Sequence, residues 1–150
     1  MKLATALSER ADIQRRLSQL GTRLENNAKV QEGETPAEEP AALLAEMDSL
    51  LSRLEELIAR INLTNSRTSE NGITMTEMLA KRDTLSKRIQ LMRSFLDAAS
   101  AKVDRFTRSE LRIVSTVDVA AYQKSVDDCS RDLRELDEKI QSLNWTTELM

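Results

Sequence analysis

Apolar side chains, interrupted by Arg10 and Arg82, recur at alternating steps of three and four residues through most of this chain. This spacing places them on one stripe of an α-helix, the seam through which helices pack against their neighbours. The pattern predicts four helices, near residues 2–29, 41–63, 75–106 and 118–144. The four seams are Leu3, Ala6, Arg10, Ile13, Leu17, Leu20 and Leu24; Met47, Leu51, Leu54, Ile58 and Ile61; Met75, Met78, Arg82, Leu85, Ile89, Met92, Leu96, Ala99, Val103 and Phe106; and Val119, Tyr122, Val126, Cys129, Leu133, Leu136, Ile140 and Leu143.

Turn and cap residues stand between the predicted helices. Gly and Pro residues interrupt the first connection, and Asn71-Gly72 ends the second. Thr74, with Glu77 three residues later, fits a capping box at the start of the third helix. Either Thr116 or Asp118 caps the fourth helix, since both side chains accept a hydrogen bond from a free N–H group of the first turn.

These elements predict an all-α fold, an antiparallel bundle of long helices formed by two helical hairpins. The hairpins would span about residues 2–65 and 74–147 of a single domain, 1–150. A small β element is also expected, because residues 111–117 are rich in β-branched side chains and residues 28–31 have a weaker extended character. Both segments would lie at the same end of an up-down bundle, so we expect a short strand pair at that loop end.

The two halves of the chain resemble each other. Aligning residue 3 with residue 75 pairs Arg10 with Arg82, and aligning residue 46 with residue 128 pairs Asn62 with Asn144. Leucines match between any two helices that share a heptad repeat, but shared seam arginines and shared helix endings are not expected. An internally duplicated hairpin and a chance similarity both remain open at this point.

The composition excludes most active-site chemistry. The 150 residues include no His and one Cys, which rules out the usual zinc sites, Cys-His pairs and Ser-His-Asp triads. Di-iron bundles also need His, so we expect no enzyme activity, no cofactor and no metal. With 22 Lys+Arg against 25 Asp+Glu, no strongly basic face attracts nucleic acid. No apolar run approaches the ~20 residues that span a bilayer, and no secretory signal is evident, so we expect a cytoplasmic protein without a membrane partner.

Two charged segments have both a structural and a binding interpretation. Four glutamates lie in the first connection: Glu32, Glu34, Glu38 and Glu39. The Asp and Asn ligands of a calcium loop are missing there, which favours a solvated acidic loop. The basic segment 102–112 would lie at the same end of the bundle and face that loop, and its acidic residues argue against phosphate binding. We expect residues 33–40 to be mobile, or to be ordered only by contacts with that basic connection.

A polar cluster is the one candidate binding site. Arg10 and Arg82 lie on apolar seams about two turns into the first and third helices. Asn62 and Asn144 lie at matching ends of the second and fourth helices. A buried guanidinium needs acceptors, which these amides and the last-turn carbonyls would supply. The cluster either fixes helix register, as polar seam residues do, or forms a pocket where paired arginines bind an anion against Trp145.

The chain also resembles a family of small bacterial proteins that are often labelled septicolysin and have no assigned function. The segments that carry the resemblance are Glu9–Asp12, Asn27–Glu34, Ser115–Ala120 and Leu143–Leu149. The resemblance spans residues 2–149 and implies a compact helical protein. The label implies a thiol-activated cytolysin, but such cytolysins resemble each other in a Trp-rich, Cys-containing loop. Here Cys129 lies in a seam, which favours a buried inert thiol, and Trp145 is the only Trp.

The function that these observations favour is a non-enzymatic structural or protein-interaction role. Long seams on a thin bundle leave apolar surface uncovered, which promotes self-association. We therefore expect a homo-oligomer, with another protein as the alternative partner. The competing interpretation, which follows from the label, is a membrane-active, cytolysin-like protein.

Overall fold

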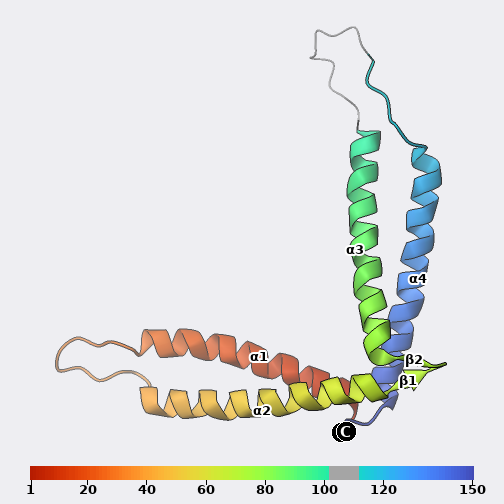
Figure 1. Ribbon diagram of the computed structural model, residues 1–150. Helices are drawn as coiled ribbons and strands as arrows, with labels where there is room; N and C mark the ends of the chain where they lie inside the picture. Colours follow the sequence, from red (N-terminus) through yellow and green to blue (C-terminus); the bar gives the residue numbers. More distant parts are fainter. Residues whose placement is uncertain (102–111) are drawn as a thin grey trace. The chain divides into compact units, whose positions relative to one another are not determined.

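The fold is all-α and consists of two helical hairpins, as predicted. The computed structural model describes residues 1–101 and 112–150. Helix α1 (Leu3–Asn26) lies beside α2 (Pro40–Arg67), and α3 (Met75–Ser100) lies beside α4 (Val119–Thr146) (Figure 1). Residues Met1–Thr74 and Ser142–Met150 form one compact unit, and Met75–Gln141 form the other.

The helix ends differ from the predicted bounds by a few residues, and local chemistry explains several of them. Pro40 occupies the first turn of α2, where its missing N–H costs nothing. The Asp118 carboxylate accepts a hydrogen bond from the Ala121 N–H at 3.1 Å, so Asp118 rather than Thr116 caps α4. Helix α3 ends at Ser100; its predicted continuation, with Val103 and Phe106, lies outside the described residues from position 102 onward.

A small β element exists, but not at the predicted place. Strands β1 (Ser69–Glu70) and β2 (Ile73–Thr74) pair antiparallel in the connection between α2 and α3. Asn71 and Gly72 between them have φ values of 53° and 79°, the left-handed conformations that a two-residue hairpin turn requires. Residues 28–31 and 112–117 form no strand, and Leu111 lies outside the described part of the chain. The Asn-Gly turn signal therefore outweighs the β-branched composition of the other segment.

The core of the first unit corrects the predicted seam of α2. The buried residues of this helix are Leu43, Leu50, Leu57, Ile61 and Thr64. Of the predicted seam, only Ile61 is among them, whereas Leu51 and Ile58 are 44% and 40% exposed. The α1 seam is placed as expected, with Leu3, Ala6, Ile13 and Leu20 buried. Helix α2 thus packs on α1 through a stripe adjacent to the one that heptad counting selected.

The second unit packs around Ile89, Leu96 and Val126, all of which lie on the predicted seams of α3 and α4. Cys129 packs against this cluster, as its seam position predicts, but it is half-buried rather than buried. At the outer edge of the α3–α4 contact, the Phe95 and Tyr122 rings meet edge to face, with centroids 6.5 Å apart.

The two ends of the chain are joined within the first unit. The Leu3 N–H donates to the Thr147 carbonyl at 2.9 Å, and the Leu149 N–H donates to the Met1 carbonyl at 2.8 Å. The Met1 amine and Lys2 Nζ lie 3.1 and 2.8 Å from the Glu148 carboxylate. These cations lower the pKa of Glu148 through hydrogen bonds. The last residues of the chain are therefore held against the start of α1.

Replacing Leu57 by Ala tests the corrected seam. Leu57 is fully buried against α1, so Leu57→Ala should lower the free energy of unfolding by about 2–5 kcal/mol, measured by urea denaturation. Leu63 on the same helix is 40% exposed, and Leu63→Ala should cost less than about 1 kcal/mol. Equal losses for the two variants would show that the inner stripe of α2 is misassigned.

Candidate functional site

The most distinctive surface of the first unit is an exposed apolar stripe on α2. Leu44, Leu51 and Ile58 follow one another at intervals of seven residues and are 46%, 44% and 40% exposed. Between them lie the half-buried Met47 and Leu54. We call these five residues the outer face of α2. An open groove of about 470 Å³ runs along it, lined by Leu51, Leu54, Glu55, Ile58 and Ala59.

The opposite side of α2 is polar and tied to α1. Arg53 follows Leu51 by two residues, so it lies on the far side of the helix. The Arg53 guanidinium donates to the Glu9 carboxylate at 2.7 Å and to Glu56 at 2.6 Å. These hydrogen bonds hold the pKa values of both glutamates below their usual range. One side of α2 is therefore bound to its hairpin partner, while no described residue forms an ion pair across the outer face, and Leu44, Leu51 and Ile58 are exposed there.

Two acidic residues flank the outer face. Asp48 lies three residues before Leu51 and Glu55 four residues after it, so both project beside the apolar stripe. Both side chains are exposed, and neither forms an ion pair with any residue in the described ranges 1–101 and 112–150. The outer face thus presents aliphatic side chains with an acidic edge.

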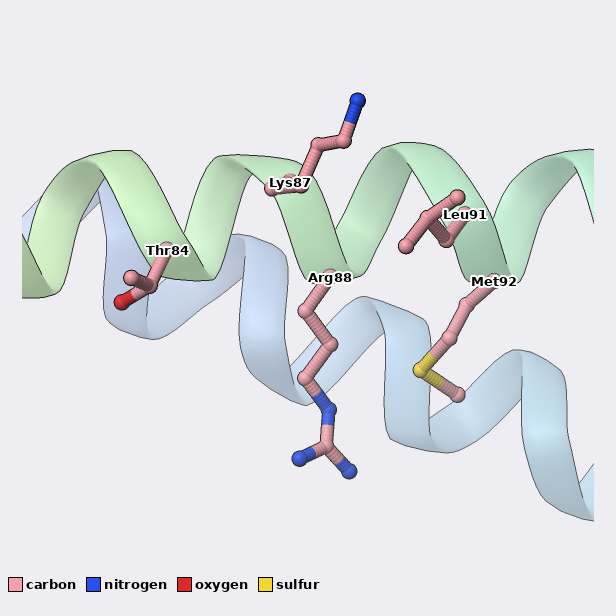
Figure 2. A pocket seen from close by; sticks show the side chains of 5 residues that line it. All are labelled: Thr84, Lys87, Arg88, Leu91 and Met92. Carbon is pink, nitrogen blue, oxygen red and sulfur yellow. The ribbon is translucent and has the colours of Figure 1, made fainter.

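A second apolar groove, of about 520 Å³, lies on α3 and has the opposite charge. Thr84, Lys87, Arg88, Leu91 and Met92 line it. Leu91 is 60% exposed, and Phe95, one turn further along, is 48% exposed. Figure 2 shows the charged ends of Lys87 and Arg88 pointing in opposite directions away from Leu91. Neither cation is ion-paired within the described part of the chain. We call Thr84, Lys87, Arg88, Leu91 and Phe95 the basic face of α3.

The acidic loop is anchored by α1, contrary to expectation. The Glu38 N–H donates to Asn27 Oδ1 at 2.9 Å, and Asn27 Nδ2 donates to the Arg23 carbonyl at 2.9 Å. Arg23 also donates to both Glu38 carboxylate oxygens and lowers the pKa of Glu38. The loop is therefore held by its own hairpin. The other three glutamates are exposed, as a solvated loop predicts, and no group of acidic residues in the described ranges is arranged to hold a metal ion.

The five residues of the predicted polar cluster have different surroundings. In the first unit, Arg10 is half-buried and Asn144 is 7% exposed, but Asn62 and Trp145 are exposed, the latter by 66%. In the second unit, Arg82 donates to the neighbouring Asp83 at 2.7 Å. The expected wall of Trp145 is thus open to solvent. An anion site at these residues stays a prediction.

Burial also shifts the proposed internal alignment. Leu43 and Val126, Leu57 and Ile140, and Ile61 and Asn144 are each 83 residues apart, and both members of every pair are buried. The alignment that pairs Asn62 with Asn144 uses 82 residues and matches an exposed side chain with a buried one. The two asparagines are therefore not equivalent, and the resemblance of the helix endings does not extend to their packing.

The structure and its two grooves define the class: an all-α protein of two helical hairpins that carries uncovered apolar helix faces. The chain belongs to a family of unknown function, DUF6847, whose model matches residues 10–149. A crystal structure described as that of a functionally unknown conserved protein from Corynebacterium diphtheriae is similar, with 42% sequence identity and a TM-score of 0.93 over 100% of this chain and 99% of that one. No curated protein matches. Nothing in these comparisons supports the septicolysin label.

Acidification tests the anchored loop. Glu38 has a pKa below its ordinary value of 4.5 because Arg23 donates to it. Its stabilising effect is therefore present above that value and is lost as the pH falls through the lowered pKa. Glu38→Gln should destabilise the protein at pH 7 in urea denaturation, and the difference from wild type should vanish in strong acid.

Glu34→Gln is the matched control for that experiment, since Glu34 lies in the same loop, is exposed and forms no ion pair with a described residue. It should leave stability unchanged at both pH values. A Glu38→Gln deficit that is equally large in strong acid would contradict the role of the ionised pair.

Proposed function

We propose that this protein is a non-enzymatic interaction protein that self-associates through the outer face of α2. The observation that carries the proposal is the row of Leu44, Leu51 and Ile58 at heptad spacing, exposed on the side of α2 away from its ion pairs. Residues seven apart on one helix form a seam that a second helix can cover. An uncovered apolar seam with a polar edge is typical of a protein–protein contact.

A membrane-active role is the competing proposal, and the chemistry of the outer face does not favour it. Helices that lie in a membrane interface carry Lys and Arg beside their apolar stripe, which attract anionic lipids. The outer face of α2 has Asp48 and Glu55 in these positions. Among the described residues, no helix is long and apolar enough to cross a bilayer. We expect no leakage from liposomes at concentrations where the protein self-associates.

Light scattering with size-exclusion chromatography tests the proposal. The protein should form a defined oligomer, and Leu51→Gln should raise its dissociation constant about tenfold, because a central apolar contact is lost. Leu63→Gln is the control: Leu63 is on the same helix and 40% exposed, but it lies off the outer face. A wild-type protein that stays monomeric over the whole concentration series would contradict self-association.

A further inference from the structure

The outer face of α2 and the basic face of α3 are complementary in charge and similar in size. Each is an open groove on one helix, of about 470 and 520 Å³. The first has an edge of Asp48 and Glu55, and the second has Lys87 and Arg88 on either side of Leu91. Apolar contact in the middle with opposite charges at the rim is the arrangement found in specific protein interfaces.

The spacing of these charges allows them to meet. Asp48 and Glu55 lie three residues before and four residues after Leu51, and Lys87 and Arg88 lie four and three residues before Leu91. If Leu51 of one helix lies against Leu91 of another, Lys87 and Arg88 come within one helical turn of an acidic residue in either orientation. This residue is Asp48 when the helices are parallel and Glu55 when they are antiparallel. Neither face is complementary in charge to a second copy of itself. Two outer faces of α2 would bring acidic side chains together, and two basic faces of α3 would bring cations together.

We propose that the occupant of the outer face of α2 is the basic face of α3 from a second copy of this chain. This inference rests on the proposed function and adds the identity of the opposing surface. Every copy carries both faces, so a two-fold pair makes the contact twice, α2 on α3 and α3 on α2. Such an arrangement closes the assembly and avoids open-ended growth.

A pair of charge-reversed variants tests the proposal. In the first, Asp48→Lys and Glu55→Lys make the α2 face basic; in the second, Lys87→Glu and Arg88→Glu make the α3 face acidic. Each variant alone then presents like charges in both contacts and should self-associate at least about fivefold more weakly than wild type. When the two are mixed, both contacts regain opposite charges, so the mixed pair should associate within about twofold of wild type.

Controls separate this result from unfolding and from general charge effects. All four positions are exposed, so circular dichroism and thermal unfolding should match wild type. Glu135→Lys, an exposed reversal on α4, should leave self-association unchanged. A second, uncharged test mixes Leu51→Gln with Leu91→Gln: each alone loses both contacts, while the mixed pair keeps one intact contact and should recover part of the association.

The outcomes distinguish this proposal from the one on which it rests. If Leu51→Gln weakens self-association but the charge-reversed variants behave as wild type and gain nothing on mixing, the α3 partner is wrong and the role of the α2 face stands. If the wild-type protein does not self-associate, both proposals fail. If reversal at Lys87 and Arg88 abolishes only binding to phosphatidylserine vesicles, the basic face is a lipid contact and the proposal is overturned.

Discussion

The packing of one leucine stripe of α2 against α1 determines which surface the first unit exposes. Helix α2 repeats a pair of adjacent aliphatic residues every seven positions: Leu43-Leu44, Leu50-Leu51 and Leu57-Ile58. Neighbouring residues on a helix point about 100° apart, since 3.6 residues make a turn. One partner helix cannot cover both stripes. Because α1 covers Leu43, Leu50 and Leu57, the other stripe remains on the surface and forms the outer face.

Ion pairs between α1 and α2 favour the same orientation of α2, in which the Leu43, Leu50 and Leu57 stripe is buried. Arg53 reaches Glu9 on α1, and Arg23 on α1 reaches Glu38 and Glu46. Both sets of bonds require the side of α2 that carries Arg53 to lie near α1, which leaves Leu51 on the far side. Exposed ion pairs contribute little stability individually. They nevertheless fix which orientation of α2 is compatible with its partner, and they leave Asp48 and Glu55 without an ion pair to any described residue.

The sequence predicts the four helices correctly, but it does not predict which stripe of α2 is buried. Steps of three and four predict all four helices and the buried stripes of α1, α3 and α4, except that Tyr122 of the predicted α4 seam is 45% exposed. In α2, Met47, Leu51, Leu54 and Ile58 follow the alternation better than the buried set, in which three residues are seven apart. The repeated aliphatic pairs are the signal that α2 has two apolar faces. The positions of the apolar and charged residues on α1 distinguish the two faces, and this is tertiary information.

Other errors have similar causes. The β-branched composition of residues 111–117 favours a strand there, whereas the Asn71-Gly72 turn, with its left-handed backbone, determines where the hairpin forms. The polar cluster relied on an equivalence of Asn62 with Asn144 that burial does not support. In each case a pattern within one segment does not determine which contacts that segment makes with others. Such contacts depend on which face each helix turns inward, and a shift of one residue turns a helix by more than a quarter of a circle.

In the proposed assembly, association covers the outer stripe of α2, whereas folding covers the inner stripe. Methyl NMR with a soluble paramagnetic agent measures this directly, with Leu57, Leu51 and Leu63 as reporters. Leu57 methyls should be shielded at every protein concentration, and Leu63 methyls should always be accessible. Leu51 methyls should change from accessible to shielded as the concentration rises, as the proposed association requires. Leu51 methyls as accessible as those of Leu63 throughout the series would contradict it.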